Sequence, residues 1–358
     1  MAKKTEEEKR HSALYREYRP HAFKDVRGQD QVVSVLEAAI KKGTIAHAYV
    51  FSGTRGTGKT SIARILAHEL GTADHDIYEI DAASNRGIDD IRELRDGVAL
   101  MPFSSRYKVY IIDEAHMLTK EAWNALLKTL EEPPAHVLFI FATTELHKVP
   151  DTIKSRCDVY TFSQPSRALL SDVVSDVAKQ EGYALERSAA DLVATLAEGS
   201  FRDALGILQK VLTISKDKKV DIAEVEKVTG APTGTILRAL TSALHTGDAN
   251  AALAAVHHAI QGNMDARTLL KLVLERVRAV MLARNAPDVA DLIAHEFTQA
   301  DFAEITAMGK DPASKINSNL LRALLAAHEQ MAYAALPHLP IELALLDTLA
   351  DSRKPTAL

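Results

Sequence analysis

An eight-residue stretch near the start of the chain has the residue types and spacing of a phosphate-binding loop. The segment GTRGTGKT, from Gly53 to Thr60, matches the pattern G-x-x-x-x-G-K-[ST]. Lys59 would reach the β- and γ-phosphates, and the Thr60 hydroxyl would bind Mg²⁺. An apolar segment at 46–53 precedes the loop and helical spacing follows it, which favours a nucleotide site over a chance glycine-rich turn. We expect the nucleotide to contact Gly53, Thr54, Arg55, Gly56, Thr57, Gly58, Lys59, Thr60 and Ser61.

A pair of carboxylates supplies the second half of this chemistry. In VYIIDEAH, four apolar residues lead to Asp113 and Glu114, which we expect at the carboxyl end of a strand. An aspartate at this place helps to hold Mg²⁺ in P-loop NTPases, and a glutamate beside it can polarise an attacking water. The alternative for such a pair is a solvated turn. For His116, packing is a better prediction than proton transfer.

Three more polar side chains stand where they could serve the same ligand. Thr144, with Thr143, ends the apolar run HVLFIFATT, where a hydroxyl can bond the attacking water or simply cap a strand. Arg202 in GSFRDAL lies near a predicted helix start and could reach the γ-phosphate or form a surface salt bridge. Arg156 in TIKSRC follows the sheet edge where ligands bind in open α/β folds, with a local ion pair as the alternative.

Apolar and helical segments alternate over roughly the first 165 residues. The expected strands are 46–53, 77–82, 108–115, 136–144 and 158–162. Strands separated by helices imply a parallel sheet covered on both faces. From Ser163 onward the strand signal disappears, and GAPTG at 230–234 has the composition of a linker. The predicted fold class is α/β followed by all-α, with a nucleotide-binding domain at 13–163, a helical lid at 164–230, a helical collar at 235–350, and terminal segments 1–12 and 351–358.

Composition places the chain among ordinary globular proteins. Its 358 residues, 47% hydrophobic and 25% charged, suffice for two or three domains. No apolar run reaches the ~18 residues that span a bilayer, and the charged N-terminus is no signal peptide, so we expect no membrane partner. The single cysteine, Cys157, excludes a disulfide framework and fits a cytoplasmic location. The net charge of −5 weighs mildly against nucleic acid as the main partner.

The motifs together resemble one family. GTRGTGKT, EIDAASNRGIDDIREL, VYIIDEAHMLTKEAWNALLKTLEEPP, FATTELHKVPDTIKSRC and GSFRDAL are similar to the gamma/tau subunit of the bacterial DNA polymerase III clamp loader. The similarity is dense over 13–230 and weak over 231–358. It implies an ATP-hydrolysing AAA+ domain that uses ATP and Mg²⁺, a helical lid, and a collar that joins other clamp-loader subunits in a five-membered ring. The implied partners are the sliding clamp and primer–template DNA.

The resemblance also implies roles for single residues. Arg156 matches the arginine finger, which contacts the γ-phosphate held by the neighbouring subunit. Thr144 matches the sensor-1 position and Arg202 the sensor-2 position. The segment Tyr18, Arg19 and Pro20 falls where the family borders the adenine. The expected catalytic residues are then Lys59, Glu114, Thr144, Arg156 and Arg202.

The sequence departs from the family in two places. The family carries a four-cysteine zinc module between the P-loop helix and the EIDAAS strand, where this chain has only AHELGTADHDIY. His68 and His75 are too few for a structural zinc site, which needs four ligands, so we expect no zinc. The chain also stops at Leu358, soon after the collar, and so resembles the short form or a truncated chain.

A clamp loader must hold DNA, and in a chain of net negative charge that contact must be local. Ser84, Asn85, Arg86 and Arg92 lie near a predicted helix start and could hold phosphates, although a solvated mixed-charge helix is the alternative. Two other functions stay open. One is a stand-alone AAA+ motor such as a branch-migration helicase, which would form a six-membered ring. The other is a non-hydrolysing scaffold like the delta-prime subunit, against which the intact Lys59 and Glu114 argue.

Overall fold

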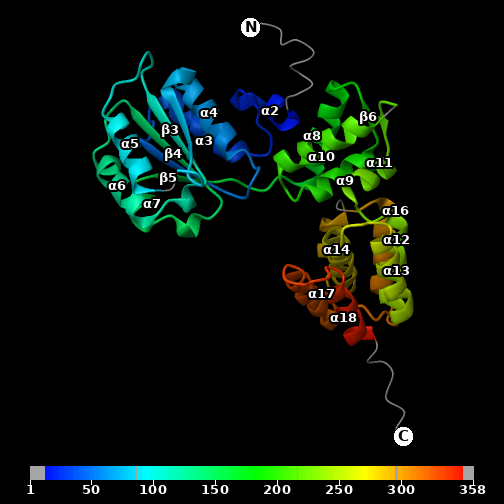
Figure 1. Ribbon diagram of the computed structural model, residues 1–358. Coiled ribbons are helices and arrows are strands. Elements are labelled where there is room, and N and C mark those ends of the chain that lie inside the picture. Colours follow the sequence, from blue (N-terminus) through cyan, green and yellow to red (C-terminus); the bar gives the residue numbers. More distant parts are fainter. Residues whose placement is uncertain (1–12, 86, 216, 295–296, 350–358) are drawn as a thin grey trace. The chain divides into compact units, whose positions relative to one another are not determined.

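The computed structural model describes residues 13–85, 87–215, 217–294 and 297–349 (Figure 1). The chain forms two compact units. The first holds the residues up to Val177 together with Ala197–Gln209. The second holds Ala178–Leu196 and the residues from Lys210 onward.

A parallel sheet is the framework of the first unit. Its strands are β1 (Ala48–Ser52), β2 (Ile77–Asp81), β3 (Lys108–Asp113), β4 (Val137–Thr143) and β5 (Asp158–Thr161). They run in the order β2-β3-β4-β1-β5, and every pairing is parallel. β1 and β4 are buried along their whole length, as central strands covered on both faces are. The carboxyl ends of β1, β3 and β4 therefore meet at one edge of the sheet.

Helices cover both faces of this sheet (Figure 1). One face packs against α3 (Asp30–Lys42) and α4 (Lys59–Glu69), and the other against α5 (Ile88–Val98), α6 (Lys120–Glu131) and α7 (Asp151–Lys154). Strand β4 shows why: Leu138 and Ile140 join the first core, whereas Phe139 and Phe141 join the second. Shorter elements complete the unit: α2 (Leu14–Glu17) and the 3-10 turns η1 (Phe23–Asp25), η2 (Asp74–Asp76), η3 (Ala115–Met117) and η4 (Leu146–Lys148).

Helix α6 has clear start and stop signals. The Thr119 side chain accepts a hydrogen bond from the Ala122 backbone N–H at the start of the helix. The helix ends at Glu131, just before two consecutive prolines that cannot continue it. Between these ends Trp123, the only tryptophan of the chain, packs on Phe141 of β4 with ring centroids 5.1 Å apart. Strand β4 and helix α6 are thus joined through a buried aromatic pair.

The segment after the sheet is mostly helical. It comprises α8 (Arg167–Gln180), β6 (Ala184–Leu185), α9 (Arg187–Leu196), α10 (Phe201–Ile214), β7 (Lys219–Val220) and α11 (Ile222–Thr229). Strands β6 and β7 pair in parallel, and α9 packs against α11. The boundary between the two compact units runs through α8 and α10, so the predicted three-domain division stays a prediction.

The rest of the second unit is a helical assembly around one apolar core. Its helices are α12 (Gly234–Thr246), α13 (Ala249–Gln261), α14 (Ala266–Asn285), α15 (Pro287–Leu292), α16 (Gln299–Lys310), α17 (Ser318–Gln330) and α18 (Leu339–Leu349). The long helix α14 packs against α12, α16 and α17 and supplies much of that core. The buried Arg276 of α14 pairs with the partly buried Asp301 of α16 at 2.6 Å and so links the two helices.

The predicted fold class is confirmed. Each of the five expected strands is present, with ends that differ by at most two residues from the predicted ones. The expected change from strands to helices after Ser163 also occurs, apart from the two-residue strands β6 and β7. Among the described helices, none is both long and apolar enough to span a bilayer.

Candidate nucleotide-binding site

The glycine-rich loop joins the carboxyl end of β1 to the first turn of α4. Gly56 and Gly58 have φ angles of +76° and +103°, which residues with a side chain rarely adopt. Gly58 is the N-cap of α4, so the helix begins at Lys59 and its unpaired N–H groups are directed back toward the loop. Backbone donors and the positive end of a helix together suit a phosphate anion.

Lys59 lies inside this loop with 6% of its surface exposed. Its Nζ donates to the carbonyl oxygens of Gly53 and Thr54, both at 2.8 Å. Burial lowers the pKa of the Lys59 ammonium, and the nearby carboxylates of Glu114 and Asp113 offset part of that shift. Two neutral carbonyls compensate a buried cation only in part, so the site favours an anion beside Nζ.

Thr60 and Asp113 come together from α4 and β3. The Thr60 hydroxyl donates to Asp113 Oδ2 at 2.8 Å. Ser61, the next residue on α4, accepts a hydrogen bond from Arg19 Nε at 3.0 Å. A hydroxyl and a carboxylate side by side at the foot of a phosphate loop are oxygen donors of the kind that Mg²⁺ prefers. The residues present therefore fit a magnesium ion bound together with a nucleotide.

Glu114 is held in an unusual conformation next to this pair. Its φ of 48° lies in the left-handed region, which costs a non-glycine residue of order 1–3 kcal/mol. Its backbone N–H donates to Asp113 Oδ1 at 2.9 Å. Its carboxylate accepts a hydrogen bond from the Thr144 hydroxyl at 3.4 Å and lies 3.5 Å from His116 Nδ1. The turn after β3 thus sets Glu114 between the loop and the end of β4, where it could act on a water.

His116 and Thr143 form the support behind Glu114. His116 Nδ1 lies 3.2 Å from the hydroxyl of the fully buried Thr143, and Nε2 lies 3.5 Å from Glu145 Oε1. The same Thr143 hydroxyl accepts the Glu145 backbone N–H at 3.0 Å. His116 is nearly buried among these groups. These contacts are polar, so the packing role expected for His116 from the sequence stays a prediction.

The start of α10 lies directly against the phosphate loop. The Phe201 N–H donates to the Gly56 carbonyl at 3.0 Å, and a Cβ on Gly56 would meet Ser200 Oγ at 2.0 Å. Arg202 stands one residue further, with its guanidinium carbon 5.0 Å from the centre of the Tyr15 ring. Sequence reasoning missed both Ser200 and Tyr15. Each partner is far away in the chain, so no local pattern could have indicated the contact.

The N-terminal segment contacts the start of α4 through Arg19. Arg19 is partly buried beside α4, and this burial, with Arg64 nearby, lowers the pKa of its guanidinium. Pro20 follows it, and Tyr18 caps α2 with its backbone N–H on Leu14 O. Gln29, which sequence reasoning also missed, bonds Thr57 O and the backbone of Ser163. Gln29 thus links the phosphate loop to the segment after β5. A single glutamine before a helix matches no sequence motif, so the sequence could not predict this link.

Arg156 is not brought together with the other candidate residues. It follows α7, and its Nη1 donates to Thr152 O at 2.6 Å and Ser155 Oγ at 3.3 Å. Its Nη2 pairs with Glu131 Oε1 at 2.6 Å. None of its contacts among the described residues is to the phosphate loop. The neighbouring Cys157 is partly buried, and burial raises the pKa of its thiol to about 12.

The structure describes only part of the candidate DNA contacts. Arg86 lies outside the described residues, and so does the side chain of Arg92. Ser84 and Asn85 form the turn after β2, where the Ser84 hydroxyl and the Asn85 amide both bond Asp81. Their role in binding DNA stays a prediction.

The region where the resemblance would place a zinc module contains two histidines in local pairs. His68 lies 3.4 Å from Asp74, and His75 lies 3.6 Å from Asp76 and 2.7 Å from Ser104 Oγ. Over the described part of the chain, no group of three or more His, Cys, Asp or Glu side chains is arranged to hold a metal ion. The expected absence of zinc remains a prediction for chemical analysis.

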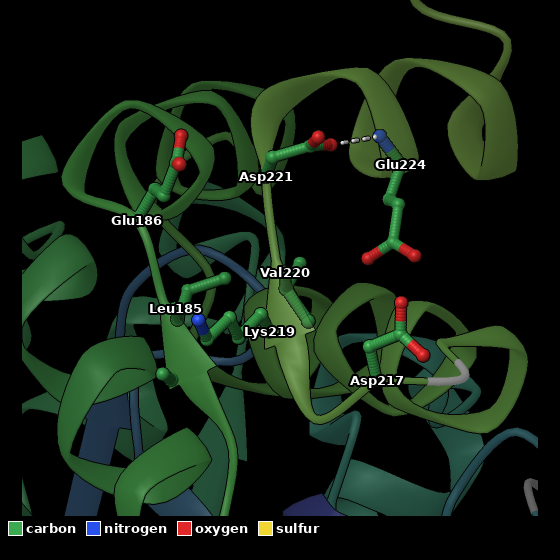
Figure 2. A pocket seen from close by; sticks show the side chains of 8 residues that line it. Leu185, Glu186, Asp217, Lys219, Val220, Asp221 and Glu224 are labelled. Carbon is green, nitrogen blue, oxygen red and sulfur yellow. Dashed lines mark hydrogen bonds between the residues drawn. The ribbon is translucent and has the colours of Figure 1, made fainter.

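A cavity in the second unit is separate from this site. It measures about 430 Å³ and lies where β6 and β7 meet the start of α11 (Figure 2). Glu186, Asp217, Asp221 and Glu224 give it an acidic lining, with Lys219 as the cation. The Glu224 backbone N–H donates a hydrogen bond to Asp221 Oδ1 at 2.9 Å. Asp221 is thus the N-cap of α11 and has a structural role.

Fold and site together define the class. The chain is a P-loop protein with the AAA+ fold. The same fold occurs in RuvB, the Holliday junction branch migration motor of Thermotoga maritima, with a TM-score of 0.52 and 22% identity over 67% of this chain and 85% of that one. At this level of identity the likeness shows the fold and carries no argument about function.

Sequence relatives are more specific. A family model described as "DNA polymerase III, delta subunit" matches residues 28–85 and 71–166. DNA polymerase III subunit gamma of Buchnera aphidicola is 30% identical over 95% of this chain and 99% of its own length. DNA polymerase III subunit tau of Bacillus subtilis is 34% identical over 97% of this chain. The chain belongs to the gamma/tau subunit family of DNA polymerase III.

Many members of this family are longer than the present chain. The chain spans 65% of the length of the Bacillus subtilis relative and 52% of the DNA polymerase III subunit gamma/tau of Mycobacterium tuberculosis. For this chain, activity and partners are therefore proposals that rest on the residues of the site.

Proposed function

We propose that the chain is an ATP-hydrolysing subunit of the DNA polymerase III clamp loader, which opens the sliding clamp and loads it onto primer–template DNA. The observation that carries this proposal is the meeting of Lys59, Thr60, Asp113 and Glu114 at the carboxyl edge of the sheet, in a chain of the gamma/tau family. A scaffold that never hydrolyses ATP would have no use for Glu114 in a strained turn beside Asp113.

The chemistry follows from the site residues. Loop N–H groups and Lys59 bind the phosphates, while Thr60 and Asp113 would hold Mg²⁺. When bound there, Mg²⁺ would supply positive charge that offsets the negative charge developing on the phosphoryl group during its transfer. Glu114 orients a water and takes its proton as the water oxygen bonds the γ-phosphorus and the bond to the leaving ADP oxygen breaks. Thr144, which already contacts Glu114, keeps that carboxylate in place.

Other residues complete the nucleotide site. Tyr18, Arg19 and Pro20 border the base, and Arg202 contacts the γ-phosphate from the start of α10. Arg202 must turn from the Tyr15 ring to do so. The contact of Phe201 and Ser200 with Gly56 supports this role, because movement of the loop and of α10 is coupled there.

Arg156 acts on a neighbouring subunit. It is a third exposed and makes no contact with its own loop within the described residues, whereas an arginine finger supplied in trans needs to reach another chain. Arg156 then stabilises the charge on the phosphoryl group bound by that neighbour.

Assembly into a ring of five is proposed for the C-terminal helices. Exposed apolar side chains gather on and between α17 and α18: Leu325, Tyr333, Leu336, Leu339, Leu343 and Leu346. Apolar surface of this kind favours association with other subunits.

For DNA, we keep the proposal that Ser84, Asn85, Arg86 and Arg92 contact phosphates. Each subunit of the ring would then add a small part of the total affinity for DNA.

The test is ATP hydrolysis by the chain in complex with its partner subunits. We expect activity that requires Mg²⁺ and rises when sliding clamp and primer–template DNA are added together. A Glu114→Gln variant should bind ATP with unchanged affinity and lose hydrolysis. Hydrolysis stimulated by branched DNA with no response to the clamp would support a branch-migration motor instead, and no hydrolysis at all would support a scaffold.

A further inference from the structure

We propose that Glu131 is a positioning residue for Arg156. The Glu131 carboxylate holds the Arg156 guanidinium in the orientation that Arg156 presents to the neighbouring subunit. The inference rests on the proposed role of Arg156 as a residue that acts in trans. It concerns a side chain that touches neither nucleotide nor metal in its own chain. Glu131 acts only through Arg156.

The contacts fix the guanidinium in one plane. Nη2 pairs with Glu131 Oε1 at 2.6 Å, and Nη1 donates to Thr152 O at 2.6 Å and to Ser155 Oγ at 3.3 Å. These acceptors come from the end of α6 and from α7 with the residue after it. Among the described residues Nε has no acceptor, so donor capacity remains for an anion outside the chain. A planar fork held on one side loses less freedom when it binds phosphate on the other.

The position of Glu131 at the end of α6 favours a role beyond helix formation. It is the last residue of α6, where the negative end of the helix disfavours a carboxylate. The chain nevertheless places Glu131 and Glu132 there, ahead of two prolines that fix the exit of the backbone. Arg156 is the group that compensates the charge of Glu131. Glu132, the next residue, makes no ion pair within the described part of the chain.

Stability is a poor explanation for the pair. The Arg156 side chain is 33% exposed and that of Glu131 is 50% exposed. Pairs with this exposure contribute little to folding, because water screens them and two long side chains lose freedom. Removal of Glu131 should therefore leave Tm nearly unchanged, and a loss of rate would reflect the placement of Arg156.

The experiment compares Glu131→Ala, Glu131→Gln and the adjacent control Glu132→Ala in the assembled clamp-loader complex. We expect kcat for ATP to fall about tenfold in Glu131→Ala, with KM within about twofold, because ATP binding belongs to the neighbour's loop. Glu131→Gln keeps an oxygen acceptor and should retain at least about a third of the rate. Glu132→Ala should match the unmodified chain.

Mixed complexes locate the defect. A Glu131→Ala chain with an intact loop, next to a Lys59→Ala chain with an intact Arg156, should hydrolyse ATP at the normal rate per such interface. An unchanged or raised rate in Glu131→Ala would overturn the proposal, and a raised rate would mean that Glu131 restrains Arg156. A defect that stays with the ATP-binding chain would also overturn it. If Arg156→Ala itself keeps full activity, the trans role of Arg156 has failed instead.

Discussion

Lys59 and Arg156 are both cations expected at a phosphate, but their surroundings differ. Lys59 is buried, and its ammonium bonds two carbonyls of its own loop. Arg156 is a third exposed and lies at the end of α7, held by groups that are not part of the loop. A buried lysine can serve only the phosphates that enter its own loop. An exposed arginine, by contrast, is free to reach the phosphates bound by another chain.

Arg156→Ala should therefore separate binding from hydrolysis. ATP affinity should be unchanged, whereas hydrolysis in the assembled complex should fall by roughly 10³–10⁵, as an arginine of this kind contributes. Lysine should substitute poorly, since it cannot make the bidentate contact. The isolated subunit should be slow already and change little. The measurements are ATP binding by fluorescence titration and steady-state hydrolysis.

Complementation tests the trans assignment. Arg156→Ala chains mixed with Lys59→Ala chains should regain activity at interfaces that pair the intact loop of one with the intact arginine of the other. Mixed complexes that form but stay as inactive as either variant alone would make Arg156 a structural residue of its own subunit.

Asp76 is a buried carboxylate away from the site that should respond to acid. Burial alone raises its pKa, but bonds from the backbone N–H groups of Phe103, Ser104 and Ser105 prevail and lower it to about 2. A lowered pKa means that the carboxylate stabilises the fold above its unfolded value of ~3.9, and that this is lost as pH falls toward 2. Asp76→Asn should thus be less stable than the unmodified chain at pH 6.

The pH dependence checks that sign. The difference in the free energy of unfolding between the two chains should shrink between about pH 4 and pH 2. Urea titrations at several pH values would measure it. A difference that stays constant down to pH 2 would show that the three backbone bonds do not depend on the charge of Asp76.

The residues that could be predicted from the sequence are those whose chemistry is written in local spacing. Lys59 and its two carbonyl partners lie within six residues of one another, and Asp113 follows an apolar strand directly. Gln29 bonds Ser163, 134 positions away, and Glu131 bonds Arg156 across 25 positions. Such contacts exist only after the sheet has brought distant segments together. The sequence predicted an ion pair as the alternative for Arg156, and the pair is present.

At the scale of elements, the decisive junction is the start of α10 on the phosphate loop. Ser200 caps that helix by accepting the Asp203 N–H at 3.1 Å, and the next residue bonds Gly56 O. Gly56 has both a left-handed φ and no room for a Cβ. The phosphate loop can therefore pack this closely against the start of α10 only because position 56 has no side chain.

Gly56→Ala should weaken both folding and ATP binding. The left-handed φ alone costs a residue with a Cβ about 1–2 kcal/mol, and the clash with Ser200 Oγ at 2.0 Å adds to it. We expect ATP affinity to fall at least about tenfold, since the loop must shift. Gly43→Ala is the matched control, because Gly43 has φ +69° with nothing within 4 Å of its Cβ. Equal losses of Tm in the two variants would show that contact with α10 is unimportant.

At the scale of the whole molecule, the residues proposed for nucleotide binding and those proposed for assembly lie in different compact units. Lys59 belongs to the first compact unit, whereas the exposed apolar residues of α17 and α18 belong to the second. Lys59→Ala should abolish ATP-dependent clamp loading and leave the oligomer intact on gel filtration. Loss of the oligomer in this variant would contradict the separation. A Leu343→Glu change on α18 is the converse control and should dissociate the complex.

The metal content is a second property of the whole chain. The segment AHELGTADHDIY, from the end of α4 into β2, has no cysteine; its His68 pairs with Asp74, and its His75 contacts Asp76 and Ser104. Elemental analysis should find no zinc, whereas hydrolysis should require added Mg²⁺. About one zinc per chain would contradict this prediction.

The aromatic pair under α6 also makes the chain convenient to observe. Trp123 is the only tryptophan, it is buried, and it rests on Phe141, two residues before the strand ends at Thr143. The helix that carries it ends at Glu131, the partner of Arg156. Tryptophan fluorescence therefore reports on a single place, between strand β4, which leads to Thr143 and Thr144, and helix α6, which leads to the partner of Arg156. Trp123 is therefore a natural fluorescent probe of the structure that joins the proposed hydrolysis site to the proposed arginine finger.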